Sequence, residues 1–257
     1  MTTHADKAAG FAALHRPGHP VVLFNIWDAG GAKALEQAGS PAIATGSHGI
    51  AGAQGYADGE RIPLDEVLHL VRRITASVAV PVTVDVEGGY ATDPATLTAN
   101  VARVIAAGAV GVNFEDQIVG GAGLHAPEVQ AARIAAVAAA GTASGLPFFV
   151  NARTDVFLKA PAAQHAALVP EALARAAIYA AAGASGLFVP GLVDAGLLAA
   201  VVQGTPLPVN AMASPTQHPA ADLARLGIAR ISHGPFPWRA AMAALADGWR
   251  GAAVGSV

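Results

Sequence analysis

The chain has 257 residues, 53% hydrophobic and 13% charged, with a formal net charge of −3 and no cysteine. This balance, without any run of like charge, argues against nucleic acid or an anionic membrane as a partner, and the lack of cysteine excludes disulfides, thiolate metal sites and cysteine nucleophiles. No apolar stretch approaches the roughly 20 residues that span a bilayer, and Met1 to Gly10 lacks the order of a signal peptide, so we expect a cytoplasmic protein.

Eight short apolar runs recur along the chain, and alanine-rich stretches that favour helix separate them. Each run is flanked by Gly or Pro, as is typical of parallel strands that are buried on both faces. In chain order the runs are Val21–Ile26, Ala42–Thr45, Val82–Val86, Gly111–Glu115, Phe148–Asn151, Gly186–Val189, Pro208–Ala211 and Arg230–Ser232.

Four of the intervening helices should end at a glycine, which adopts the left-handed cap conformation without steric cost. These glycines are Gly39, Gly108, Gly183 and Gly227, and a strand run follows each within a few residues. Eight strands alternating with helices in about 250 residues predict an α/β protein with a single (β/α)8 TIM barrel over residues 1–257. A doubly wound open sheet is the alternative. The chain then ends in a helical segment at about 236–250.

Polar residues gather after the second, third, fourth, fifth and seventh runs, which is the catalytic face of a barrel. The third run ends in Asp85-Val86-Glu87, and alternation along a strand predicts that Asp85 and Glu87 point the same way, about 6–7 Å apart. The fourth run adds Glu115, whereas its neighbour Asp116 should face a helix amide or a basic group. Inward carboxylates repel without a cation, and oxygen ligands suit Mg²⁺ or Mn²⁺. A turn with solvated acids is the alternative.

The fifth run leads to Arg153, which shares its parity with Asn151, so both side chains can face the barrel mouth. A guanidinium fixed there would bind a carboxylate or phosphonate through two parallel hydrogen bonds. The alternative is a structural ion pair with Asp155 or Asp116.

The second run is followed by Thr45-Gly46-Ser47, whose backbone N–H groups and hydroxyls could bind an anionic oxygen. Asp58 follows in a Gly-rich segment and, taken alone, fits a turn better than a catalytic role. Four histidines lie at or just beyond strand ends, and one of them could act as general acid or base, although for any single one a structural or solvated role is favoured. They are His48, His125, His218 and His233.

The motifs Asp85-Val86-Glu87-Gly88-Gly89-Tyr90, Gly111-Val112-Asn113-Phe114-Glu115-Asp116-Gln117 and Asn151-Ala152-Arg153-Thr154-Asp155 resemble, in order and spacing, those of the isocitrate lyase/phosphoenolpyruvate mutase superfamily. The resemblance extends from about Asn25 to Pro235. It implies a Mg²⁺ shell of Asp85, Glu87 and Glu115, partly through waters.

The same resemblance implies a binding site for the substrate. Arg153 would bind one substrate carboxylate and the Thr45-Gly46-Ser47 turn another, Asn210 would be a substrate-binding asparagine, and Ser214 could join it. Members of this superfamily stabilise an enolate and break or make a C–C or P–C bond. They also form tetramers in which a C-terminal helix packs on a neighbour, so we expect a dimer or tetramer that uses the apolar helix Trp238–Trp249.

Two departures separate this chain from the superfamily pattern. The loop Ile118–Leu124 lacks the lysine and the acid/base cysteine of the lyases, which leaves His125 as the titratable side chain beside it. Its glycines predict a lid that is mobile and closes over the site, which would make His125 the proton donor. The alternative is that His125 caps the helix that begins near Pro127. The sixth run ends in Phe188-Val189-Pro190, where lyases have a glutamate and mutases a histidine.

The favoured hypothesis is a Mg²⁺-dependent lyase or hydrolase that cleaves a C–C bond of a small 2-oxo or 2-hydroxy carboxylate through a metal-stabilised enolate. A P–C bond mutase or hydrolase acting on phosphonopyruvate-like substrates and a non-catalytic metabolite-binding barrel are the alternatives. A Schiff-base aldolase is disfavoured, because Lys7, Lys33 and Lys159 all lie outside the strand runs.

Overall fold

A computed structural model of the protein describes residues 2–213 and 218–254, and within them nine parallel strands form one sheet. The strands are β1 (Val21–Leu23), β2 (Asn25–Ile26), β3 (Ile43–Thr45), β4 (Val82–Asp85), β5 (Gly111–Glu115), β6 (Phe149–Arg153), β7 (Gly186–Phe188), β8 (Val209–Met212) and β9 (Arg230–Ser232). The helices are α1 (His4–Ala13), α2 (Ala29–Gln37), α3 (Ser47–Ala53), α4 (Leu64–Ser77), α5 (Pro94–Ala106), α6 (Pro127–Ala143), η1 (Ala162–Gln164), α7 (His165–Ala181), α8 (Ala195–Gly204), α9 (Ala220–Arg225) and α10 (Phe236–Val254).

The strand order β1-β9-β8-β7-β6-β5-β4-β3-β2 places two consecutive strands at opposite ends of the sheet. The expected first run, Val21–Ile26, is interrupted at Phe24, so that β1 pairs with β9 and β2 pairs with β3. The interruption explains why nine strands replace the eight that were expected. One stretch of chain thus joins both ends of the sheet, and the prediction of a (β/α)8 barrel is confirmed.

The predicted strands and helix ends agree closely with the structure. The runs Gly111–Glu115 and Arg230–Ser232 are strands with those bounds, and the remaining boundaries shift by one or two residues. The four expected cap glycines all have positive φ, between 85° for Gly227 and 100° for Gly183. The prediction from glycine placement is therefore confirmed at each joint.

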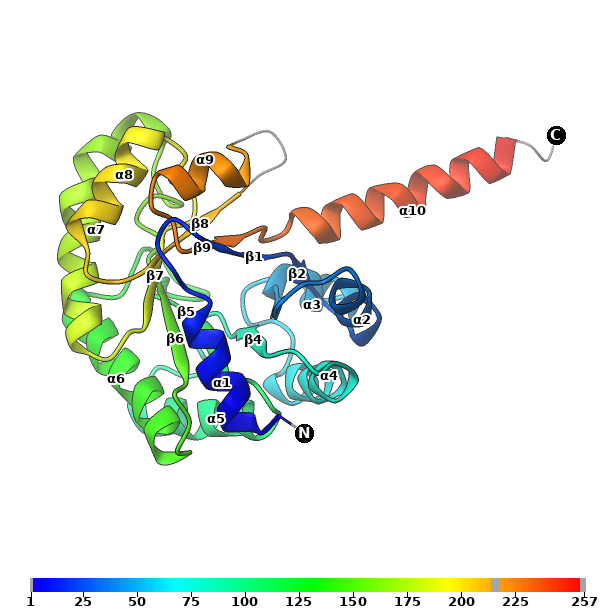
Figure 1. Ribbon diagram of the computed structural model, residues 1–257, viewed down its shortest axis with the longest axis horizontal. Coiled ribbons are helices and arrows are strands. Elements are labelled where there is room, and N and C mark those ends of the chain that lie inside the picture. Colours follow the sequence, from blue (N-terminus) through cyan, green and yellow to red (C-terminus); the bar gives the residue numbers. More distant parts are fainter. Residues whose placement is uncertain (1, 214–217, 255–257) are drawn as a thin grey trace.

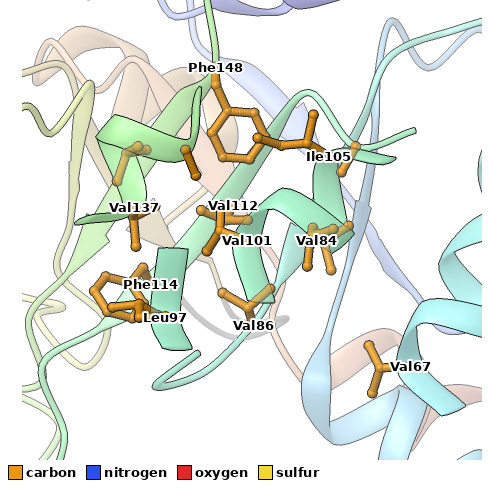
Figure 2. Close-up of a cluster of buried hydrophobic side chains, with 14 of the residues drawn as sticks. Val67, Val84, Val86, Leu97, Val101, Ile105, Val112, Phe114, Val137 and Phe148 are labelled. Carbon is orange, nitrogen blue, oxygen red and sulfur yellow. The ribbon is translucent and has the colours of Figure 1, made fainter. Parts of the chain in front are cut away.

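The largest apolar core lies between the outer face of β4 and β5 and the helices that cover it (Figure 2). Val84 and Val112 of these strands are fully buried and belong to the same cluster as Val101 of α5 and Val137 of α6. The inner face is different, because polar side chains such as Asn113 alternate with these valines. The barrel therefore has an apolar exterior under the helices and a polar interior.

The last helix, α10, leaves the barrel instead of lying along it (Figure 1). Its first turn packs on β2, where the rings of Trp27 and Trp238 meet edge to face at 5.0 Å. Farther along, Leu245 and Trp249 are 69% and 72% exposed. Phe24, between β1 and β2, is also 44% exposed, so apolar surface is uncovered on both the barrel and the helix. None of the described helices is both long and apolar enough to cross a membrane.

Candidate active site at the carboxyl ends of the strands

The carboxyl ends of the strands surround a cavity of about 190 Å³. Among the residues predicted to form a site, those that line it are Gly46, Ser47, Asp58, Asp85 and Arg153. They come from the segments after β3, from β4 and from β6, which are far apart in the sequence. The fold therefore brings together five of the eleven predicted site residues at one cavity.

Asp85 ends β4 and is tied to the segment after β3. Its carboxylate accepts a hydrogen bond from the Ser47 backbone N–H at 3.3 Å, and its own N–H donates to the Thr45 hydroxyl at 3.0 Å. Thr45 is fully buried and does not line the cavity. The Thr45-Gly46-Ser47 turn therefore orients Asp85, and one of its backbone donors is already used by this carboxylate.

Glu87 does not continue the strand. β4 ends at Asp85 and Glu87 has a φ of 51°, so the strict alternation expected for these two acids is wrong. The turn directs the Glu87 carboxylate to the Glu60 backbone N–H, which donates to both of its oxygens at 3.0 Å. Glu87 is 5% exposed and does not line the cavity.

Arg153 is held by two carboxylates. Its Nε and one terminal nitrogen donate to the two oxygens of Asp155 at 2.6 and 2.8 Å, and the other terminal nitrogen lies 2.9 Å from Glu115. The structural ion pair with Asp155 is thus present, and Arg153 nevertheless lines the cavity. Because a guanidinium has more N–H donors than these three contacts use, Arg153 can still donate to a ligand.

The acidic residues have the donor chemistry of a site for a hard divalent cation. Burial, reinforced by the charge of Asp85, raises the pKa of Glu87 to about 8. Burial also raises the pKa of Glu115 to about 8, although Arg153 opposes this shift. A divalent cation would relieve the repulsion and favour the charged carboxylates.

The acids are not arranged as a finished coordination shell. Over residues 2–213 and 218–254, no three His, Asp or Glu side chains are grouped as a metal site. The contacts explain this, because the Glu87 carboxylate accepts a hydrogen bond from the Glu60 backbone N–H and the Glu115 carboxylate pairs with Arg153. The metal site formed by Asp85, Glu87 and Glu115 stays a prediction that donor chemistry supports.

A second titratable pair lines the same cavity. His48, in the first turn of α3, has its Nδ1 atom 3.7 Å from an Asp58 carboxylate oxygen. Asp58 is therefore placed at the cavity and not only in a distant turn. A histidine beside a carboxylate is an arrangement that can serve in proton transfer.

His125 lies elsewhere, beside a separate cavity of about 330 Å³ that Glu60 and Arg133 also line. Its backbone N–H donates to the Asp116 carbonyl, and α6 has Ala126 as its N-cap without any side-chain cap. The expectation that His125 caps this helix is wrong. The loop before it is a short hairpin, with a bridge between Gln117 and Leu124, and its predicted closure over the site stays a prediction.

Asp116 faces away from the site, as expected from its parity. Its carboxylate accepts hydrogen bonds from the Tyr179 hydroxyl at 2.8 Å and from Arg175 at 3.3 Å. Arg175 is the basic group that the sequence led us to expect, and this acid is structural.

Asn210 is buried inside the barrel below the cavity, where its amide donates to the Ser232 hydroxyl at 3.0 Å. Asn210 does not line the cavity, and its role in substrate binding stays a prediction. Ser214 lies outside the described residues.

Sequence reasoning missed several residues that line the cavity. Asn113 and Ser232 are polar residues within strand runs, a signal that could have found them, whereas Arg239 lies in a helix and carried no signal. Four apolar side chains also line the cavity: Leu158, Phe188, Pro190 and Met212. A ligand in this cavity therefore meets apolar side chains as well as charged and amide groups.

Comparison with known proteins gives one consistent result. The family model for phosphoenolpyruvate phosphomutase matches residues 11–252. An uncharacterized protein of Mycobacterium tuberculosis is 35% identical over 240 residues, which cover 93% of this chain and 87% of that protein. The 2-methylisocitrate lyase of Escherichia coli is 29% identical over 219 residues, 82% of this chain and 71% of the lyase.

Solved structures agree with these relatives. A provisionally named phosphonomutase from Burkholderia cenocepacia is 44% identical, with a TM-score of 0.95, and the match covers 97% of this chain and all of that one. A phosphonopyruvate hydrolase solved with oxalate and Mg²⁺ shares the fold with a TM-score of 0.82 at 24% identity, over 94% of this chain and 84% of the hydrolase.

Proposed function

Because the chain belongs to the phosphoenolpyruvate phosphomutase family, within the isocitrate lyase/phosphoenolpyruvate mutase superfamily, we propose that it is a Mg²⁺-dependent enzyme, with Mn²⁺ as the alternative metal. The proposed reaction cleaves a C–C bond of a small 2-oxo or 2-hydroxy carboxylate, as a lyase or hydrolase, through an enolate. One observation carries this proposal. Asp85 and Arg153 line the same small cavity, so a cation ligand and a carboxylate-binding guanidinium lie within reach of one substrate.

The proposed binding roles divide between the cation and the substrate carboxylate. Asp85, Glu87 and Glu115 would hold the cation, which supplies positive charge beside the oxygen that becomes negative. Arg153 would donate its free N–H groups to the substrate carboxylate, and its contacts with Asp155 keep the guanidinium in one orientation. These residues bind and orient the substrate before any bond is broken.

For the proton we propose His48, with Asp58 as its partner, in place of His125. Both members of this pair line the cavity, and they lie 3.7 Å apart, whereas His125 lines a different cavity. A carboxylate beside Nδ1 favours the tautomer that carries its hydrogen on that nitrogen. The pair could therefore deliver a proton to the carbon from which the bond is broken.

The apolar residues that line the cavity favour C–C over P–C chemistry. Phe188 and Pro190 offer a phosphonate group neither a cation nor a side-chain hydrogen-bond donor. The P–C mutase or hydrolase remains the second candidate, because the relative from Burkholderia cenocepacia that is 44% identical bears the name phosphonomutase. C–C cleavage gives carbon fragments only, whereas P–C chemistry gives inorganic phosphate or a phosphorylated product.

We also propose that the enzyme is a dimer or tetramer joined by α10. The helix leaves the barrel while Leu245 and Trp249 stay exposed, and Phe24 is exposed on the barrel between β1 and β2. An exposed apolar helix face and an uncovered apolar barrel surface both gain stability by burial. Packing of α10 on a neighbouring barrel would cover both.

The experiment that tests the reaction is a screen of 2-oxo acids, malate and citrate homologues and phosphonopyruvate with Mg²⁺ present. Proton and phosphorus NMR of the mixtures would identify the products, and Asp85→Ala would serve as the inactive control. We expect cleavage of a carboxylate into two carbon fragments. Release of phosphate or conversion of phosphonopyruvate would instead establish the second candidate. Binding of Mg²⁺ and oxalate without turnover of any compound would indicate a metabolite-binding barrel.

A further inference from the structure

A buried arginine lies under the floor of the cavity. Arg230 is 1% exposed and its side chain points into the barrel from β9. Within the described part of the chain it makes no ion pair, and its Nη1 atom has no hydrogen-bond partner. Its other nitrogens contact Asn113 and Ser232, and both of these residues line the cavity above.

Arg230 determines how the Asn113 amide is oriented. A guanidinium can donate hydrogen bonds but cannot accept them, so the Asn113 atom that faces Arg230 must be the oxygen. This oxygen accepts from Arg230 Nη2 at 3.0 Å and from the Asn151 amide at 2.8 Å. The NH₂ group of Asn113 consequently points away from these partners, and Asn113 lines the cavity.

Ser232 is oriented by the same rule. Its hydroxyl oxygen accepts a hydrogen bond from the Asn210 amide at 3.0 Å and one from Arg230 Nε at 3.3 Å. A hydroxyl has two acceptor positions and one donor hydrogen, so both acceptor positions are used. Its hydrogen is then left to donate, and Ser232 lines the cavity.

We propose that Asn113 and Ser232 form a donor floor that binds a carboxylate oxygen of the ligand, with Arg230 as the positioning residue that fixes the direction of their hydrogen bonds. This inference rests on the proposed function, since it assigns a subsite within that cavity. Asn113 and Ser232 offer N–H and O–H groups toward the cavity, and an anionic acceptor satisfies both.

The charge of Arg230 supports the same ligand class. Arg153 is already balanced by Asp155 and Glu115, whereas Arg230 has no acid within hydrogen-bond distance among the residues described. Burial lowers the pKa of Arg230 to about 9, with Asp85 opposing the shift, so the group remains a cation at neutral pH. An anion above the floor would gain from this charge, which no carboxylate contacts among the residues described.

Calorimetric titration with oxalate in the presence of Mg²⁺ tests the floor. Ser232→Ala removes one donor and should weaken oxalate binding by about tenfold or more, as expected for a hydrogen bond to a charged group. Asn113→Asp replaces the amide donors with a repelling carboxylate and should weaken binding by about 100-fold. Thr83→Val is the matched control, since the buried Thr83 hydroxyl has no partner and does not line the cavity. It should leave oxalate affinity within about twofold.

Two substitutions of Arg230 test the positioning role. Lysine, like arginine, can only donate, whereas glutamine also carries an acceptor oxygen and allows the network to reverse. We expect Arg230→Gln to weaken oxalate binding by about tenfold and Arg230→Lys to weaken it by less than about threefold. Circular dichroism melting would confirm that each variant is folded. Arg230→Gln binding oxalate as well as Arg230→Lys would overturn the positioning role.

The outcomes distinguish this inference from the proposed function. If the unaltered protein binds Mg²⁺ and oxalate and Ser232→Ala binds oxalate equally tightly, the donor floor is overturned and the proposed function stands. If the unaltered protein binds neither Mg²⁺ nor oxalate, both are overturned. Ser232→Ala is the decisive variant, because it deletes one oxygen atom and creates little strain.

Discussion

Replacing Arg153 with lysine separates its two roles, one in the fold and one in binding. The guanidinium makes three contacts of 2.6 to 2.9 Å with Asp155 and Glu115, whose side chains are 0% and 5% exposed. A lysine keeps the charge but cannot reproduce the fork. Breaking a buried pair costs about 3–5 kcal/mol, and with the charge retained we expect the free energy of unfolding to fall by about 3 kcal/mol.

Binding should suffer as well. Lysine cannot donate two parallel hydrogen bonds to a ligand carboxylate. This loss should weaken Mg²⁺-dependent oxalate binding by about 2–3 kcal/mol, roughly 30- to 140-fold in Kd. Calorimetry measures the affinity and urea unfolding measures the stability. Arg103→Lys is the matched control, because Arg103 pairs with Asp65 at the surface, where the side chains are 46% and 81% exposed. It should change stability by less than about 0.5 kcal/mol.

Two results would contradict these expectations for Arg153. An unchanged oxalate Kd in Arg153→Lys, with reduced stability, would leave Arg153 as a structural residue only. Unchanged stability would mean that the contacts with Asp155 and Glu115 do not hold the folded chain together in solution.

The remaining predictions concern the metal, pH, assembly and His125. Asp85→Ala should abolish Mg²⁺ binding in calorimetry, and retained affinity would contradict the metal site. Without metal, the free energy of unfolding should fall as pH rises from about 4.5 to about 8, because folded Glu87 and Glu115 still hold protons that the unfolded chain has released. Mg²⁺ should reduce this slope in urea titrations, and an equal slope with metal would count against it. Leu245→Glu should convert a dimer or tetramer to a smaller species in light scattering; a monomeric parent protein would refute the interface. His125→Gln should keep kcat within about threefold on the substrate found, whereas a loss of about 100-fold would restore His125 as the proton donor.

The fold was predictable because its signals are local and repeated. Strand runs and cap glycines recur with each β/α unit, and each signal depends on only a few neighbouring residues. The division of the first run at Phe24 was not predictable, because it reflects pairing with β9 and β3 at the same time.

The site was predictable where a residue ends a strand, as Asp85 and Arg153 do. It was not predictable at Glu87, because the strand rule was extended into a turn whose φ of 51° changes the direction of the side chain. Nor could spacing show that Arg230 directs Asn113, since these residues lie 117 positions apart and meet only across the barrel. The direction of the hydrogen bonds to Asn113 depends on its partners across the barrel, which residue spacing does not specify.

The division of the first run also governs how the protein can fold during synthesis. The ribosome releases β1 early, but its neighbour β9 emerges about two hundred residues later, as the 208-residue separation of Asn25 and His233 illustrates. The pairing of β1 with β9 must therefore form last, at the entropic cost of closing a loop that contains most of the chain. A nascent or truncated chain that lacks β9 keeps β1 and β8 as unpaired strand edges, and such edges are sites of aggregation. C-terminal truncation before Arg230 should thus yield insoluble protein rather than a smaller stable barrel.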